Sequence, residues 1–76
     1  MLRSLNEEII TMLSNLGALS EEKAVSKNIL NNSERLRDSR IDDDLKMLED
    51  SGYIRRIDGL LYLTQSGIVR AMSNYS

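Results

Sequence analysis

The chain contains no cysteine, no histidine and no proline among its 76 residues. Without cysteine it can form neither disulfides nor a thiolate zinc site, and without histidine it lacks imidazole metal ligands and the usual general base. We therefore expect no enzymatic activity, no metal and no cofactor. The absence of proline leaves glycine and short Asn/Ser clusters to mark the turns, at Gly17, 31–33, 51–52, 58–59 and Gly67.

Long apolar runs are missing as well. Residues 1–16 interleave Arg3, Glu7 and Glu8 with apolar positions, so this stretch fits neither a signal peptide nor a membrane span. We expect a cytoplasmic protein with no membrane partner. A composition of 41% hydrophobic and 29% charged residues is that of a soluble globular protein, and the length allows a single domain over residues 1–76.

An excess of positive charge is also lacking, because the formal net charge is -2. Proteins that bind nucleic acid are usually basic, so this balance counts against such a function. Phosphate contacts, however, need only a local basic patch, while acidic residues elsewhere keep the protein in solution. The placement of the arginines therefore decides the question.

The first half of the chain predicts two helices. Ser4 and Glu7 fit a capping box, and a first helix is expected to end at Gly17. Ser20 is expected to cap a second, shorter helix that ends irregularly near residues 28–31. Residues 34–38 are predicted to form either a separate turn or the tail of that helix. The predicted buried positions are Leu5, Ile9, Met12, Leu13 and Leu16 in the first helix and Ala24, Val25 and Ile29 in the second.

A third helix is predicted over residues 39–50. Ser39 and Asp42 have the spacing of a helix start, and Ile41, Leu45 and Leu48 fall on one buried face. Helical geometry turns the opposite side outward. The predicted outward residues are Ser39, Arg40, Asp43, Lys46 and Met47.

After Gly52 the apolar period changes to two, which indicates strands. The Asp58-Gly59 pair predicts a two-residue type I′ hairpin between residues 53–57 and 60–64. Such a turn sets the register, so the predicted cross-strand pairs are Ile54–Leu63, Arg55–Tyr62, Arg56–Leu61 and Ile57–Leu60. Ile54, Leu61 and Leu63 are then expected to face the core.

Thr64 is expected to cap a last helix with an apolar stripe. The stripe allows two uses: the interface of a homodimer, or packing on the first helix of the same chain, since so small a domain needs every apolar face for its core. Its residues are Ile68, Val69, Met72 and Tyr75.

The second half of the chain resembles a known family. The residues that carry the likeness are Leu45, Leu48, Glu49, the run Gly52-Tyr53-Ile54-Arg55-Arg56, then Asp58, Gly59, Tyr62, Leu63, Thr64 and Gly67. This pattern resembles winged helix-turn-helix regulators of the MarR and PadR kind, particularly small archaeal ones. The first half matches only in the order of its helices.

The resemblance implies an α+β, mostly helical winged helix-turn-helix fold, with a three-helix core, a two-stranded hairpin wing and a C-terminal helix. It implies a transcription regulator that binds double-stranded DNA sequence-specifically, with residues 39–50 as recognition helix in the major groove and residues 53–64 as a wing on the backbone. Independently of the family, a helix fits the major groove, and its first turn presents side chains and backbone N–H groups.

Specific roles follow for the outward residues of the third helix. Arg40 is predicted to read a guanine edge and Asp43 to accept from a cytosine amine, whereas Ser39 and Lys46 are predicted to hold phosphate. Four further arginines surround this helix in the sequence and are predicted to contact phosphate. They are Arg35, Arg37, Arg55 and Arg56.

The two wing arginines are not equivalent. Arg55 lies opposite the core face of the hairpin and is the better phosphate contact, although it can also stack on Tyr62 as a cation–π pair. Arg56 shares a face with Leu61, so its stem can run along the edge of the core instead.

Three alternatives remain open. The aspartates of the run 42–44 lack the spacing and the glycine of a calcium loop. Acids in the first turn of a helix complement the positive end of its dipole, which explains these residues without a metal. The same acids would repel phosphate, which favours a winged helix that binds protein in a larger assembly. An enzyme using the aspartates with a metal is a further alternative. Arg35, Arg37 and Arg40 can also be ordinary solvated charges paired to neighbouring acids.

Overall fold

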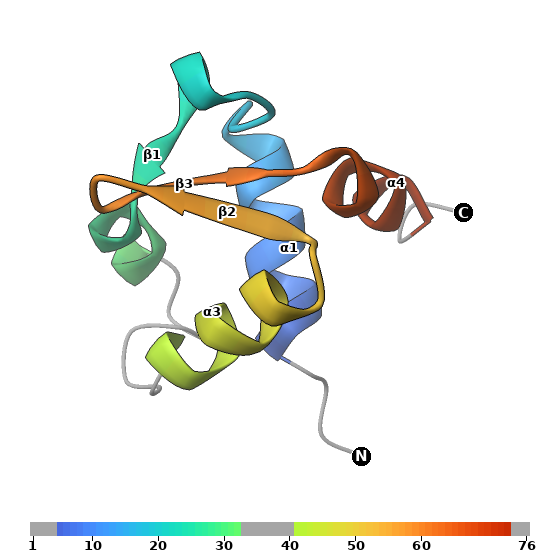
Figure 1. Cartoon of the computed structure of the whole chain (residues 1–76), viewed down its shortest axis with the longest axis horizontal. Coiled ribbons are helices and arrows are strands. Elements are labelled where there is room, and N and C mark those ends of the chain that lie inside the picture. The colour runs from blue at the N-terminus through green and yellow to red at the C-terminus, as the bar shows by residue number, and fades with distance from the viewer. Residues whose placement is uncertain (1–4, 33–40, 74–76) are drawn as a thin grey trace.

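The computed structural model describes residues 5–32 and 41–73 of the chain. Within these ranges the protein is a small α+β fold, in which helices pack around a three-stranded antiparallel sheet with the strand order β1-β3-β2 (Figure 1). The elements, with η for 3-10 helices, are α1 (Leu5–Asn15), η1 (Glu21–Lys23), β1 (Val25–Ser26), η2 (Lys27–Asn32), α3 (Ile41–Asp50), β2 (Ile54–Ile57), β3 (Leu60–Leu63) and α4 (Gln65–Ser73).

The first helix ends as predicted. Gly17 has a φ of 76°, and the N–H of Ala18 donates to the Leu13 carbonyl at 3.0 Å, which closes the helix end in a Schellman pattern. The predicted cap Ser4 lies outside the described residues. The buried face is shifted from the prediction: Ile10 is fully buried, whereas Leu16 is 40% exposed because it follows the last helical turn.

The predicted second helix is wrong. Only residues 21–23 and 27–32 are helical, both as 3-10 segments, and the backbone of Ala24 is extended (φ −60°, ψ 146°). Val25 and Ser26 instead form β1, which pairs with Leu61 and Leu60 of β3. The two-stranded wing is therefore corrected to a three-stranded sheet with β3 in the centre. The physical reason is that β1 hydrogen-bonds the edge of β3 that a two-stranded hairpin leaves unpaired.

The third helix is confirmed over Ile41–Asp50, since residues 39–40 lie outside the described ranges, and the hairpin is confirmed as well. Ile41, Leu45 and Leu48 of α3 are buried, and the turn after the helix contains Gly52, which has a φ of 84°. Asp58 and Gly59 both have positive φ, 51° and 81°, as a type I′ turn requires. The register is the predicted one, with the pairs Ile54–Leu63, Arg55–Tyr62, Arg56–Leu61 and Ile57–Leu60.

One core lies between the sheet, α1 and α3. Apolar side chains from each element reach it, and each fully buried Leu or Ile contributes about 1.5–3 kcal/mol relative to remaining exposed. The central buried residues are Ile9, Ile10 and Leu13 of α1, Ile41, Leu45 and Leu48 of α3, and Ile54, Leu61 and Leu63 of the sheet.

The last helix packs on α1 and on the hairpin. Thr64 caps α4 as predicted, since the Gly67 N–H donates to the Thr64 Oγ1 at 3.1 Å. Gly67 and Ala71 are buried, whereas Val69 and Met72 are 56% and 67% exposed. The predicted stripe is therefore only partly right as a packing face.

The reason for this difference is a close backbone approach. A Cβ on Gly67 would lie 2.0 Å from the Tyr53 carbonyl oxygen, so α4 meets the chain before β2 along its glycine side. Ile68 packs against the core, whereas Tyr75 lies outside the described residues. Val69 and Met72 are consequently turned toward solvent.

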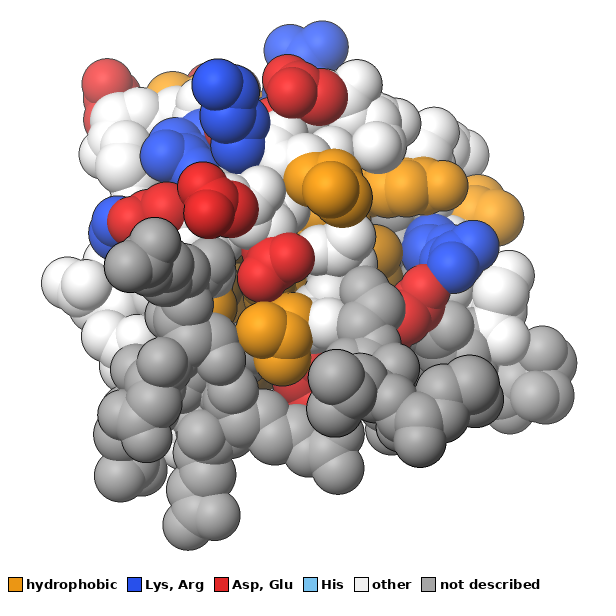
Figure 2. Space-filling view, turned by 90° about the horizontal axis from the view of Figure 1, so that it is seen from below, with side chains coloured by type: hydrophobic (Ala, Val, Ile, Leu, Met, Phe, Trp, Pro, Cys, Tyr) orange, Lys and Arg blue, Asp and Glu red, His pale blue; other side chains and the backbone are white. Residues whose placement is uncertain are grey.

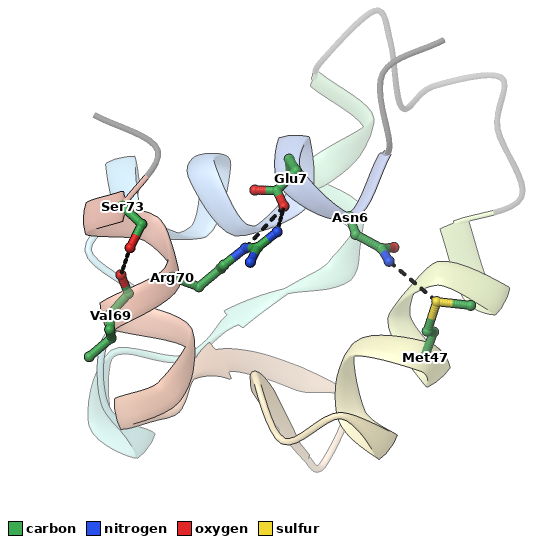
Figure 3. Close-up of polar contacts among 6 residues, drawn as sticks. All are labelled: Asn6, Glu7, Met47, Val69, Arg70 and Ser73. Atoms are coloured by element: carbon green, nitrogen blue, oxygen red, sulfur yellow. Dashed lines mark hydrogen bonds and ion pairs between the residues drawn. The ribbon is translucent and has the colours of Figure 1, made fainter. Parts of the chain in front are cut away.

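One ion pair joins α4 to α1 (Figure 3). The Arg70 Nε donates to the Glu7 Oε1 at 3.0 Å, and a second guanidinium nitrogen also contacts this oxygen. The hydrogen bond with Glu7 raises the pKa of Arg70. No helix in the described ranges combines the length and apolar character needed to cross a bilayer.

Candidate nucleic-acid interface

The eight predicted DNA-binding residues divide into two groups. Arg35, Arg37, Ser39 and Arg40 lie outside the described residues. The structure describes the other four, Asp43, Lys46, Arg55 and Arg56, and brings them to α3 and the adjoining strand β2.

The outward side of α3 is largely acidic. Asp43, Lys46 and Met47 are exposed, as predicted. The helix Ile41–Asp50 carries five carboxylates and one lysine, a net charge of −4. Figure 2 shows acidic and basic side chains interspersed over the described part of this face, with no extended basic area. Because phosphate is repelled by carboxylates, α3 alone does not supply the basic patch that DNA binding needs.

The exposed side of α3 is also tied to α1. The Asn6 Nδ2 donates to the Met47 Sδ at 3.3 Å (Figure 3). Sulfur is a weak acceptor, so this contact orients Met47 without contributing much energy. Sequence patterning carries no signal for it, since the two residues belong to helices far apart along the chain.

Arg55 is an exposed cation of the hairpin. It lies on the solvent face of β2, directly across from Tyr62, as the register predicts. Arg55 is exposed and Tyr62 is half-buried. Among the described residues Arg55 forms no ion pair. Its placement suits both uses that the sequence leaves open, a phosphate contact and stacking on Tyr62.

Arg56 lies on the opposite face and has an acidic neighbour. Its Nη2 is 3.6 Å from the Glu49 Oε2 of α3, and both side chains are about one-third exposed. This distance is short enough for an ion pair but too long for a hydrogen bond. The predicted course of the Arg56 stem along the core edge is consistent with its position opposite buried Leu61. The pair links β2 to α3.

A second ion pair anchors the start of α3. The Lys27 Nζ donates to the Asp42 Oδ1 at 2.8 Å, which joins η2 to α3. This hydrogen bond and the charge of Lys27 lower the pKa of Asp42, with a smaller contribution from Arg56. Sequence reasoning missed Lys27, because no local spacing connects it to the third helix.

The three consecutive aspartates do not act together. Asp42 pairs with Lys27, Asp43 is exposed and Asp44 is half-buried. Within residues 5–32 and 41–73, no three carboxylates converge in a group that could hold a metal ion. Asp42–Asp44 all lie in the first turn of α3, where they complement the positive end of the helix dipole.

The site thus belongs to a small α+β domain in which an exposed helix precedes an arginine-bearing hairpin. Comparison with protein-family models, with curated protein sequences and with solved structures finds no match for this chain. The class of protein is therefore given by its architecture, a three-stranded antiparallel sheet packed with helices. The function of the protein is therefore inferred from the charges and contacts of its own residues.

Proposed function

We propose that this chain is a winged helix-turn-helix domain that binds double-stranded DNA and regulates transcription. In this proposal α3 lies along the major groove, and the β2–β3 hairpin holds the phosphate backbone. A helix followed directly by a hairpin is the arrangement that the proposal needs, and the outward side of α3 is open to solvent.

The observation that supports the proposal most is that Arg55 is exposed and has no acidic partner among the described residues. An exposed arginine at the solvent face of a strand, with no acidic partner among the described residues, is free to bind a phosphate oxygen. Lys46 of α3 is likewise exposed and makes no ion pair in the part of the chain that the structure describes. The two cations come from the elements that the proposal brings to DNA.

The acids of α3 oppose this function and must be offset. Arg35, Arg37 and Arg40 precede α3 in the sequence and could supply three positive charges next to its acidic first turn. Asp43 can take part directly, because a carboxylate accepts a hydrogen bond from the cytosine amine. The proposal therefore expects modest affinity and a marked dependence on salt.

A DNA titration at two salt concentrations tests the proposal. Duplexes would first be selected from a random pool, and binding would then be followed by fluorescence anisotropy. Three or four phosphate contacts give a slope of log Kobs against log [salt] of about −3. Absence of binding at low salt, or binding that does not weaken with salt, would overturn the proposal.

A second candidate function is binding to a basic protein surface. The observation that favours it is the net charge of −4 on α3. The variant Asp50→Lys separates the two functions, because Asp50 is exposed on the same helix face as Asp43 and the change adds positive charge there without removing the proposed cytosine acceptor. It should strengthen DNA binding if α3 faces DNA, and weaken binding to a lysine-rich peptide if α3 faces a basic protein.

We also propose that the domain forms a homodimer through α4, which would present two copies of α3 to paired half-sites. The supporting observation is that Val69 and Met72, three residues apart and thus neighbours on the helix surface, are both exposed. Sedimentation equilibrium tests this arrangement. Met72→Glu should convert a dimer into a monomer, and a wild-type chain that is already monomeric at high concentration would rule the dimer out.

A further inference from the structure

Two cations, Lys27 and Arg56, line a hollow beside the β2–β3 turn. An open hollow of about 330 Å³ separates β1 and the start of η2 from the β2–β3 turn, which lie close together at the left of Figure 1. Among the described residues that line it there are two cations and no carboxylate. The lining residues are Ser26, Lys27, Asn28, Arg56, Gly59 and Leu61.

The groups around this hollow are rich in hydrogen-bond donors. Lys27 carries three N–H donors, and one of them is used by Asp42. Arg56 carries five, and its Glu49 partner at 3.6 Å is too distant to hydrogen-bond any of them. The Ser26 Oγ accepts from the Asn28 N–H at 3.2 Å, which leaves the hydroxyl hydrogen to donate. An oxyanion with several acceptor oxygens is the complementary ligand.

Each cation of the hollow forms an ion pair with a carboxylate of α3. Lys27 pairs with Asp42 and Arg56 with Glu49. Because the charge of Arg56 also acts on Asp42, the four side chains form one electrostatic cluster. All four are at least one-third exposed, so neither pair is strong, and a multiply charged ligand can displace the carboxylates.

We propose that this hollow is a phosphate site in which a phosphate oxyanion replaces Asp42 and Glu49 as the partner of Lys27 and Arg56. A guanidinium binds two phosphate oxygens at once, which a single carboxylate at 3.6 Å does not match. The phosphate belongs either to the DNA backbone, in which case the inference rests on the proposed function, or to a free ligand. The two α3 carboxylates then act as internal competitors.

Competition between the α3 carboxylates and phosphate predicts a difference between two variants that the loss of one negative charge alone would not produce. Removing Glu49 by Glu49→Gln frees Arg56, whereas Asp50→Asn removes the same charge from α3 without freeing any cation among the described residues. Glu49→Gln should therefore tighten phosphate binding by roughly threefold, in line with the strength of an exposed ion pair. Asp50→Asn should change it by much less, and Arg56→Gln or Lys27→Gln should weaken it about tenfold.

The test has two arms that use the full chain labelled with ¹⁵N. In the first, inorganic phosphate is titrated and amide shifts are followed at Ser26, Lys27, Asn28 and Gly59. In the second, a selected duplex replaces the phosphate. Shifts at these four amides, with the predicted order of affinities among the variants, support the phosphate site.

The outcomes separate the site from the proposed function. If inorganic phosphate binds in the hollow but no duplex does, the site stands for a free phosphate ligand and DNA binding fails. If the duplex binds while the four amides and the hollow variants show no effect, DNA binding stands and the phosphate site is overturned. Equal effects of Glu49→Gln and Asp50→Asn would also overturn it, because competition for Arg56 would then be absent.

Discussion

The two sides of this domain are built on different physical principles. On the side of α4, close packing predominates: Gly67 and Ala71 are buried, the Gly67 backbone leaves no room for a side chain against the Tyr53 carbonyl, and one ion pair, Arg70 with Glu7, adds to the contact. On the side formed by α3 and the hairpin, the exposed contacts are ion pairs between separate elements, Lys27 with Asp42 and Arg56 with Glu49.

Because of this difference, we expect one set of residues to determine the stability of the fold and another to determine binding. Exposed ion pairs contribute little to the free energy of unfolding, because solvent screens them, and their side chains can change partners. A tight backbone contact cannot be rearranged so easily, since the surrounding core is close-packed. Substitutions at the buried positions of α4 should therefore change stability, and substitutions at exposed positions of α3 and the hairpin should change DNA binding.

The largest expected effect is that of Gly67→Ala. In most helices alanine is favoured over glycine by roughly 0.5–1 kcal/mol. Here the added Cβ would lie 2.0 Å from a carbonyl oxygen, so the steric cost prevails and we expect a loss of about 3 kcal/mol in the free energy of unfolding. Urea denaturation measures it. Ser66→Ala, at the exposed neighbouring position, is the control, and an unchanged midpoint for Gly67→Ala would contradict the packing described.

Arg55→Gln should have the next largest effect, on binding alone. Losing one phosphate contact is expected to weaken duplex binding about tenfold at low salt and to reduce the salt slope by about 1. Lys23→Gln removes the same charge at an exposed position of η1 and serves as the matched control. Equal losses for the two variants would mean that only net charge matters.

Thr64→Ala should cost about 1 kcal/mol of stability. The hydroxyl accepts from the Gly67 N–H and donates to the Gly52 carbonyl, so it connects the start of α4 to the end of α3. Thr64→Ser keeps both hydrogen bonds and should retain most of the stability. Thermal unfolding of the two variants makes the comparison, and an alanine variant as stable as the serine variant would contradict the capping role.

The smallest expected effect concerns the Asp42 carboxyl. Its pKa is lowered in the folded protein, mainly by the hydrogen bond from Lys27. A depressed folded pKa stabilises the fold above the ordinary aspartate pKa of about 4, and this contribution is lost as the pH falls through the folded value. Lys27→Gln should return the pKa toward its ordinary value, as measured by a carboxyl ¹³C titration. An unchanged titration would show that the pair does not form in solution.

An element of the fold could be predicted from the sequence where neighbouring residues determine it, and could not where it depends on a distant part of the chain. The hairpin was predictable to the level of its register, because Asp58-Gly59 specifies the turn and the turn specifies the pairs. The ends of α1 and α3 were predictable from Gly17 and Gly52 for the same reason. The second helix was not, since Val25 has its strand partner, Leu61, in the distant hairpin.

The candidate site shows the same division. The opposite faces of Arg55 and Arg56 follow from strand alternation and were predicted. The pairing of Arg56 with Glu49 and the contribution of Lys27 depend on how η2, α3 and β2 pack, which no short-range pattern encodes. The strand face of each arginine could therefore be predicted from the local sequence, whereas tertiary packing determines which arginine forms an ion pair.

Hydrogen–deuterium exchange with and without a selected DNA duplex tests most directly whether one side of the domain binds and the other only supports it. We predict slower exchange in residues 25–28 and 41–63 when DNA is bound, with residues 65–73 unchanged. Protection confined to residues 65–73, or no protection at saturating duplex, would contradict the assignment of binding to α3 and the hairpin.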